Sequence, residues 1–436
     1  MHAPYTGVRF MMRPNGRAFK DERVTIMAFG LTKKELSWVL YDVGNSAFVM
    51  LSTALIPVYF ASIADPGSSV VVAWGYAETV ASLVLALLMP VLGSLADLAG
   101  NKKKFLVGFA GTGAVACATL GVPEHALAFL VVYVIAAIML NGSMVFYDAF
   151  LVDATTEERY DKVSSHGYAW GYIGSCIPFI ACLAVVLGGS SFGIDAKLGM
   201  KIAFIITAVW WVIFTVPVAK NVKQLHGKKR SDHVLRTTIS GLKGTVKSIV
   251  KDKRLLFFML AFFFYIDGVH TVIKMSTSYG TDLGIDSTQL VLALLVTQFV
   301  AFPSAIAYGN LAKRFGTKRM LKVGVLAYFF IVLFAAFFLK SAVEFWILAI
   351  CVGLFQGGIQ ALSRSEYGKL IPKERANEYY GFFDIFGKYA AVMGTFLVSA
   401  FTQLTGSSSL GVLSIALLFI VGYLLLRAMP PMLGDS

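Results

Sequence analysis

Long apolar segments alternate with short polar stretches along most of the chain. Because an α-helix rises 1.5 Å per residue, about 20 apolar residues match the roughly 30 Å hydrocarbon core of a bilayer. A transmembrane barrel would instead show alternating segments of about 10 residues. The pattern therefore predicts an all-α polytopic membrane protein with twelve transmembrane helices. The predicted segments are 36–63, 70–96, 104–122, 126–150, 167–188, 199–219, 255–279, 288–311, 320–339, 342–362, 379–403 and 409–427.

One polar stretch divides these segments into two sets of six. It runs from Lys220 to Arg254 and contains eleven Lys or Arg residues and two Asp residues. No other gap between apolar segments is as long or as basic. We therefore expect two pseudo-symmetric six-helix bundles joined by a basic linker. The predicted domains are a basic tail (1–35), a first bundle (36–219), a linker (220–254), a second bundle (255–427) and a C-terminal tail (428–436).

The positive charge follows the loops and indicates a membrane orientation. The net charge is +13, yet only 14% of residues are charged, against about 25% in soluble domains. One set of alternate loops, with the two ends, holds 33 Lys or Arg residues, whereas the opposite loops hold Lys197 and Lys340. Cytoplasmic loops carry such an excess. We expect both termini to be cytoplasmic, in the plasma (inner) membrane of a bacterium, and we expect no nucleic-acid partner.

Cysteine usage and the N-terminal tail point to no special chemistry. Cys117, Cys176, Cys182 and Cys351 lie inside apolar segments without metal-type spacing, so we expect buried thiols, no disulfide and no metal. No cofactor is expected. Residues 1–35 lack an apolar core followed by a small-residue cleavage site, so no signal peptide is predicted. Met27 is an alternative natural start.

The loop between segments two and three carries a motif of the form G-x3-D-x2-G-x-K-K. Its members are Gly93, Asp97, Gly100, Lys102 and Lys103. The glycines permit a tight turn, Asp97 can accept hydrogen bonds from the N-terminus of a neighbouring helix, and the lysines suit an anionic leaflet.

The motif has a weaker copy between segments eight and nine. This copy begins at Gly309 and has Lys313 where the first has Asp97. Two copies in matching loops favour an internal duplication. The spacing resembles the signature of the major facilitator superfamily, which implies a conformational latch at the first loop; we add Arg364 and Asp384 to that latch. Whether the second loop can form one stays open.

Polar residues inside the apolar segments are the candidate substrate ligands. Asp42 and Asn45 are three residues apart and share a helix face, with Asp42 ~9 Å into its segment. A buried carboxylate is costly unless it meets water, a partner or a proton, and the alternative interpretation is a helix–helix hydrogen bond or a side chain that reaches the cytoplasmic interface. The glutamines likewise suit either a polar solute or another helix. The complete predicted set is Asp42, Asn45, Asn141, Gln298, Gln356, Gln360 and Lys388.

Segment seven carries three ionisable residues in an otherwise apolar helix. Asp267, His270 and Lys274 are spaced by three and four residues, which predicts one polar stripe, and Asp267 lies ~18 Å from the start of the segment. One interpretation is a self-neutralising ion pair and the other is a proton-coupling site. Asp267-x-x-His270 matches Asp42-x-x-Asn45 in the corresponding helix of the other half, which favours a functional site.

Longer motifs resemble one subfamily. They are Tyr-Asp-x-x-Asn-Ser at 41–46, Gly-Gly-Ile-Gln-Ala-Leu-Ser-Arg-Ser at 357–365, Pro-Lys-Glu-Arg at 372–375 and Phe-Gly-Lys at 386–388. Over about residues 33–427 the chain resembles the autophagy-linked vacuolar amino-acid effluxers of fungi and their bacterial relatives. The resemblance implies the facilitator fold, alternating access and, from the fungal branch, amino-acid export. The short interspan loops resemble the bacterial branch.

Together these patterns predict a secondary active transporter, not an enzyme. The expected cargo is a small polar solute such as an amino acid, carried with protons by a monomer in the lipid bilayer. There is no Walker loop for ATP hydrolysis, and no nucleophile–base pair or metal cluster. Proton-coupled efflux of amphipathic drugs is one alternative, consistent with 14% aromatic residues. A non-transporting membrane receptor or scaffold is another, and it predicts no saturable flux.

Overall fold

A computed structural model describes residues 28–64, 70–228 and 234–430, and most of these residues are helical. Each predicted apolar segment coincides with one helix or with two consecutive helices. The helices before the linker are α1 (Lys33–Ala54), α2 (Ile56–Ile63), α3 (Val70–Ala96), α4 (Lys102–Thr119), α5 (Ala126–Ala149), α6 (Leu151–Ala154), α7 (Tyr160–Gly188) and α8 (Ala196–Asn221). Those that follow are α9 (Val234–Lys251), α10 (Lys253–Asp282), α11 (Ser287–Phe315), α12 (Thr317–Phe338), α13 (Ala342–Leu370), α14 (Ala376–Thr405), α15 (Ser408–Ser414) and α16 (Ala416–Ala428).

The fold is an all-α membrane fold. Within the described ranges, nine helices are long and apolar enough to cross a membrane, and α1 with α2, bent by 44°, would make a tenth. α4 and α14 stand outside that set. Twelve is therefore the number of predicted segments that are helical, while nine or ten is the number that meets the length and apolarity criteria.

The linker contains a helix that the basic sequence pattern did not reveal. α9 occupies Val234–Lys251, and α8 already extends to Asn221. Thr245 and Ile249, four residues apart, are buried, while Lys243 and Lys247 are exposed. This is the spacing of an amphipathic helix that lies on a protein surface.

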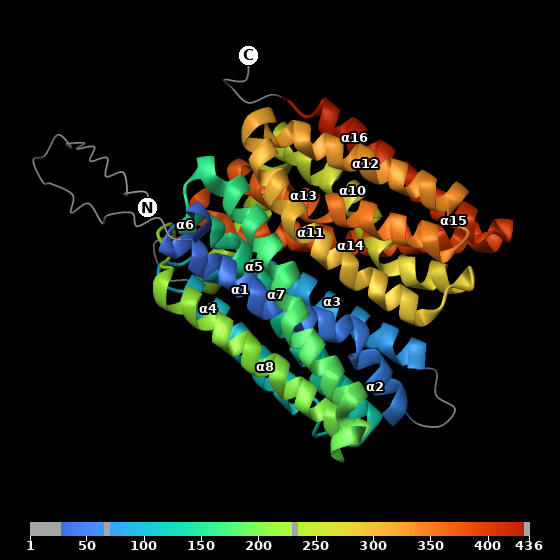
Figure 1. Cartoon of the computed structure of the whole chain (residues 1–436). Coiled ribbons are helices and arrows are strands. Elements are labelled where there is room, and N and C mark those ends of the chain that lie inside the picture. The colour runs from blue at the N-terminus through green and yellow to red at the C-terminus, as the bar shows by residue number, and fades with distance from the viewer. Residues whose placement is uncertain (1–27, 65–69, 229–233, 431–436) are drawn as a thin grey trace, which may run out of the picture.

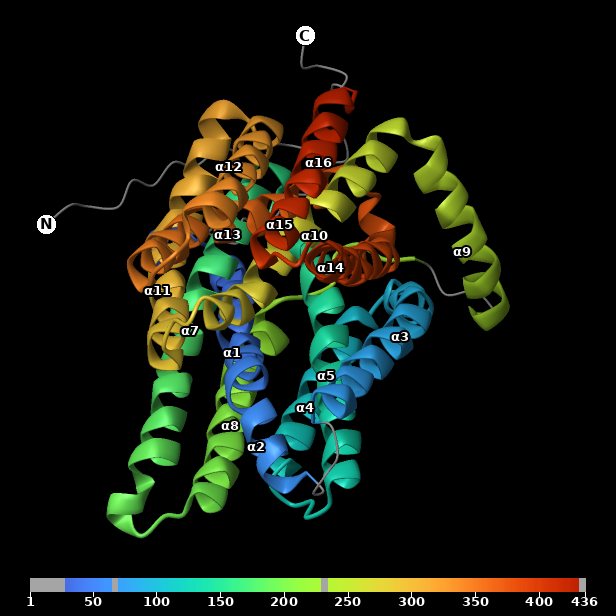
Figure 2. The same cartoon turned by 90° about the vertical axis from the view of Figure 1, so that its right-hand side faces the viewer.

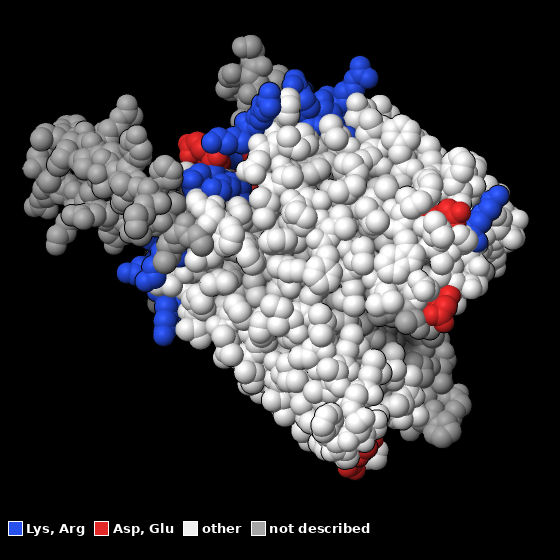
Figure 3. All heavy atoms as spheres, in the orientation of Figure 1, with Lys and Arg blue, Asp and Glu red and all other residues white. Residues whose placement is uncertain are grey.

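The helices form two halves, α1–α8 and α10–α16 (Figure 1). The halves lie against each other near α6, whereas α2 and α15 lie far apart in Figure 1 and Figure 2. We call the region around α6, the loop after α3 and the segment 222–228 the linker end. Lys and Arg side chains gather at this end, and a broad uncharged belt covers most of the face shown in Figure 3. Such a belt is what the hydrocarbon core of a bilayer requires.

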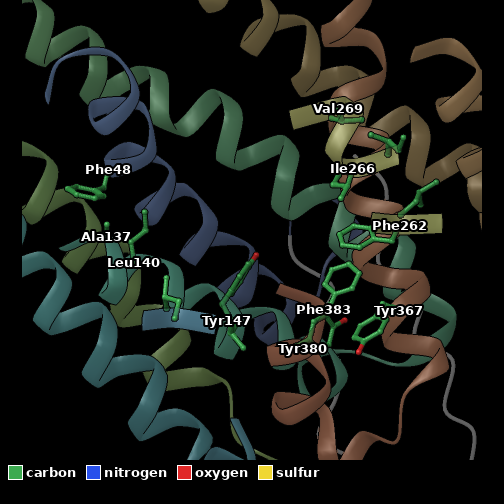
Figure 4. Close-up of a cluster of buried hydrophobic side chains, with 14 of the residues drawn as sticks. Phe48, Ala137, Leu140, Tyr147, Phe262, Ile266, Val269, Tyr367, Tyr380 and Phe383 are labelled. Atoms are coloured by element: carbon green, nitrogen blue, oxygen red, sulfur yellow. The ribbon is translucent and has the colours of Figure 1, made fainter. Parts of the chain in front are cut away.

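Aromatic packing holds the second half together near the linker end (Figure 4). Phe262 of α10 stacks on Phe383 of α14 with ring centroids 3.9 Å apart, and Tyr367 of α13 stacks on Phe383 at 4.4 Å. The hydroxyl of Tyr367 also donates to the carbonyl of Tyr379 at 2.7 Å. Because three helices share this cluster, the start of α14 is held firmly where it meets the first half.

Candidate functional site: a three-part closure between the halves

The first contact between the halves is a helix cap made by Asp97. The carboxylate is 1% exposed and accepts the backbone N–H groups of Asn377 at 2.9 Å and Glu378 at 3.0 Å. It also accepts the side-chain amide of Asn377 at 2.8 Å. An anion is favourable at a helix N-terminus, here that of α14 in the opposite half. Burial raises the pKa of Asp97 to about 6, while the charges of Lys102 and Lys228 and the hydrogen bonds from Asn377 oppose that effect.

The close approach at this cap depends on a glycine. A Cβ atom on Gly93 would lie 2.5 Å from the carbonyl oxygen of Asn377, a distance that Cβ atoms do not reach. Gly100 has φ +82°, in the region that favours glycine. The two glycines of the motif therefore serve the helix contact and the turn, respectively.

The motif lysines are used differently from the prediction that they face lipid headgroups. Lys102 is fully buried and forms an ion pair with Asp153 at 2.7 Å. Lys103 donates to the carbonyl of Ala219 at 2.6 Å. Both lysines therefore fasten the loop to its own half, and the buried cation of Lys102 is neutralised by the carboxylate of Asp153.

The beginning of the linker is attached to the same loop. Asp153 accepts the backbone N–H groups of Leu225 and His226 at 2.8 and 2.9 Å. Lys228 exchanges backbone hydrogen bonds with the loop through Asp97 and Ala99, at 2.8 and 3.1 Å. Its ammonium group then reaches the second half, where it pairs with Glu378 at 2.6 Å.

A second closure forms on the other flank without an acid in the loop. Asp161, at the start of α7, accepts from Thr317, the first residue of α12, at 2.7 Å and from Lys369 at 2.8 Å. Ser365 donates to the same carboxylate at 2.5 Å. The copy of the motif lacks an acid at Lys313, and the carboxylate comes from the opposite half instead. The loop between α11 and α12 therefore contributes to the contact between the halves through Thr317, which directly follows it, and not through an acid of its own.

The third contact centres on Arg364 of α13. Its guanidinium, 1% exposed, lies 2.9 Å from Asp148 and 3.6 Å from Asp42, both in the first half. It also donates to the hydroxyl and the carbonyl of Ser164, at 2.9 and 3.0 Å. The rings of three further first-half residues lie within 5.3 Å of the guanidinium carbon. These rings belong to Trp38, Tyr147 and Tyr168.

The Arg364 cluster joins two residues that the sequence assigned to different roles. Asp42 was predicted to bind substrate and Arg364 to act in the latch, and the structure brings them together. Asp148 and Ser164 complete the cluster and were not predicted, because nothing near them in sequence signals a partner about 200 residues away. A cation shared by two carboxylates is a strong link between the halves while it stays closed.

Several predicted solute ligands lie deeper, farther from the linker end. Gln298 of α11 and Gln356 of α13 line one cavity among α10, α11 and α13. Asn45 is buried and donates to Tyr41 of its own helix at 3.0 Å, and no described residue donates to its side-chain oxygen. Asn141 donates to Ala137 of its own helix at 2.8 Å. Of the remaining candidates, Gln360 and Asp384 are half-buried, and the side chain of Lys388 lies outside the described residues.

The three ionisable residues of α10 do not form a mutual ion pair in the described structure. Asp267 is fully buried, accepts from the backbone N–H of Gly394 at 2.9 Å and from Thr271 at 3.3 Å. Its second oxygen has no donor among the described residues. His270 is half-buried and Lys274 is exposed, so the predicted stripe runs from the interior to the surface.

Sequence reasoning overlooked Glu78, an acidic residue within α3. It is exposed and accepts a hydrogen bond from Tyr133, whose ring lies 4.3 Å from that of Trp74. Because Glu78 is an acid inside a predicted apolar segment, it could have been identified from the sequence as a candidate functional residue.

Replacing Gly93 with alanine is expected to open the linker end. The new methyl group would collide with the backbone of Asn377, and such overpacking typically costs ~1–3 kcal/mol. A cysteine placed at Ser94, which is buried beside the cap, should then react with a thiol reagent about tenfold faster than in the parent. Gly108→Ala is the matched control, since a Cβ atom at Gly108 meets nothing within 4 Å. Equal rates in both variants would contradict the close contact.

Two halves of a helical membrane protein that close on each other through a loop aspartate at a helix N-terminus match the fold of the major facilitator superfamily. Solved structures agree: the fucose transporter FucP in its outward conformation has TM-score 0.70 at 13% identity, covering 92% of this chain and 99% of FucP. A bacterial homologue of the iron transporter ferroportin, in its outward-facing state, has TM-score 0.65 at 15% identity, covering 91% and 98%. These likenesses show the fold.

Within the superfamily, the chain belongs to the family described as "Vacuole effluxer Atg22 like", whose sequence model matches residues 67–432. It is 45% identical over 408 residues to the uncharacterized MFS-type transporter YxiO of Bacillus subtilis, covering 92% of this chain and 95% of YxiO. It is 26% identical over 283 residues to autophagy-related protein 22 of Cryptococcus neoformans, covering 60% of this chain and 48% of that protein.

Proposed function

We propose that this transporter moves a small polar solute, an amino acid, across the plasma membrane by alternating access coupled to protons. One observation carries the proposal. The Asp97 cap, the second closure around Asp161 and the Arg364 cluster are all contacts between the two halves, and all three lie toward the linker end. A solute can pass that end only if these contacts separate, so their formation and release would be the switch between two states.

The orientation of this switch follows from the loop charges. With the linker end in the cytoplasm, as the basic loops favour, the structure corresponds to a state closed to the cytoplasm. The same fold is found in FucP in its outward conformation and in the bacterial ferroportin homologue in its outward-facing state, and this likeness supports the same assignment. A cysteine replacing Glu374, which is exposed at the linker end, should resist an impermeant thiol reagent in intact cells. A cysteine replacing Ser190 should react, and the reverse pattern would overturn the orientation.

The chemistry of the Arg364 cluster suits a zwitterion. When the halves separate, the guanidinium would leave Asp42 and Asp148 and expose one cation and two carboxylates. An amino acid offers a carboxylate to the first and an ammonium group to the second. The amides of Gln298 and Gln356 would add neutral donors and acceptors farther along the path. The resemblance to fungal vacuolar amino-acid effluxers supports the same class of cargo.

The proton would be carried by Asp267. A fully buried carboxylate with one oxygen lacking a donor among the described residues is favoured in its neutral form. The group would ionise when its surroundings become wet in the other state. Proton binding and release would then follow the conformational cycle.

Counterflow in proteoliposomes tests the proposal. Vesicles loaded with one unlabelled amino acid at a time should take up trace amounts of the same labelled amino acid, saturably and in a protein-dependent manner, for at least one class. Empty vesicles and vesicles with the Arg364→Gln variant serve as controls. If no amino acid gives saturable counterflow while amphipathic dyes do, the drug-efflux alternative replaces this cargo. If neither gives flux, the receptor alternative is favoured.

A further inference from the structure

The outward surface of α9 combines basic and apolar side chains on one face. Lys243, Lys247 and Lys251 are exposed and follow one another at intervals of four residues. Val246 and Val250, which lie between them, are 46% and 57% exposed. Residues spaced in this way lie on one side of a helix. We call these five residues the α9 surface.

The opposite face of α9 packs against the rest of the protein. Ile249 is buried, and α9 packs against α3 of the first half and α10 of the second. Thr245, also buried, donates to Glu378 and accepts from Arg375, both at the start of α14. The same Glu378 contributes a backbone N–H to the Asp97 cap. α9 therefore spans the junction that the cap closes.

The position of α9 places its outward surface at the level of lipid headgroups. A single residue, Asp252, separates α9 from α10, whose stretch Lys253–Ser276 is long and apolar enough to cross the membrane. Figure 2 shows α9 lengthwise on the flank of α3 and α14, while α14 itself is seen nearly end-on. A helix that leaves a membrane span and lies across its direction runs along the membrane surface.

We propose that the α9 surface binds anionic phospholipid headgroups and thereby stabilises the closed state of the linker end. Three lysines complement the negative charge of such a leaflet, and the two valines suit the boundary between headgroups and acyl chains. Lipid held by this surface fixes α9, and α9 fixes the start of α14 against α3. Opening requires α9 to leave either the lipid or Glu378. The inference uses the two states of the proposed function but neither its cargo nor its coupling.

The test measures the distance between the halves at the linker end, in lipid nanodiscs of two compositions. Spin labels are attached to cysteines that replace Glu158 and Glu374, which are exposed and lie on opposite halves. Replacing one third of zwitterionic phosphatidylcholine with phosphatidylglycerol should raise the ratio of short to long distances by about tenfold. The triple variant Lys243→Gln, Lys247→Gln, Lys251→Gln should lose this rise.

Two further variants separate lipid binding from general charge. The variant Lys33→Gln, Lys34→Gln, Lys104→Gln removes three exposed charges from the same end but leaves α9 intact, and it should keep the full rise. Thr245→Val keeps the lysines but cuts the bond to Glu378, and it should show a reduced rise. An unchanged ratio in the parent, or an equal loss in the Lys33 control, would overturn the inference. A single distance in every lipid would overturn both it and the proposed alternation.

Discussion

Replacing Arg364 with glutamine is expected to reduce solute exchange by on the order of a hundredfold or more. The guanidinium is shared by Asp42 and Asp148 and bonded twice to Ser164, so its loss leaves one buried carboxylate, Asp42, and one half-buried carboxylate, Asp148, without a cation. Removing one partner of a buried pair typically costs ~3–5 kcal/mol. In the proposed cycle the cluster closes one state only, so that cost would fall on the balance between the two states. Exchange rates in proteoliposomes, normalised to folded protein, measure the effect.

Matched variants show whether burial and charge are responsible. Lys373→Gln breaks another pair between the halves, with Glu157 at 3.2 Å, but both side chains are more than one third exposed, so it should cost at most ~1 kcal/mol. Adding Asp148→Asn to Arg364→Gln removes one uncompensated charge and should recover part of the loss. If Lys373→Gln were as damaging as Arg364→Gln, burial would not be the reason.

Replacing Asp267 with asparagine is expected to abolish accumulation driven by a pH difference while sparing exchange of solute for solute. Asparagine can still accept from Gly394 and Thr271 but cannot bind or release a proton. If one proton moves with each solute, a difference of one pH unit sustains at most about tenfold accumulation. The variant should reach a ratio of about one. Exchange needs no net proton movement and should proceed.

Neighbouring variants identify which group carries the proton. His270→Gln should shift the pH dependence of transport more than it lowers the maximum rate, since His270 is half-buried and lies about one helical turn from Asp267. Gly394→Ala should mimic the loss of Asp267, because its Cβ atom would lie 2.7 Å from the carboxylate oxygen. Sustained accumulation by Asp267→Asn under a pH difference alone would make the group structural. Asp42, in the matching helix, would then be the next candidate.

The features of this structure that could be predicted from the sequence are those determined by residues close together in the chain. Apolar runs of about 20 residues determine the helices, and the motif around Asp97 signals a helix cap because its members are neighbours in the chain. The α9 helix was not predicted from the sequence, because the linker has eleven basic residues and no long apolar run. Its buried positions nevertheless recur at helical intervals. Thr245 and Ile249 alternate with the lysines at helical intervals.

The Arg364 cluster could not be predicted for a different reason. Its partners come from α1, α5 and α7, and Ser164 is 200 positions from Arg364. No local pattern distinguishes Asp148 or Asp161 from an acid at a membrane interface. Only the packing of the two halves reveals which acids face the other half: α13 and α11 lie against α7, which carries Asp161, and Arg364 of α13 reaches Asp148 of α5.

The two flanking closures both take their acid from the first half but hold the second half by different bonds, and this difference has a mechanical consequence. On one flank, Asp97 of the first half holds the start of α14; on the other, Asp161 of the first half holds the start of α12 together with Lys369. Figure 2 places the α7–α11 pair and the α3–α14 pair on opposite sides of the molecule. Because the bonds of the two closures differ, the two closures would not break at the same time. The weaker side would yield first, so the halves would begin to part by rolling about the stronger side rather than by a symmetric rocking motion.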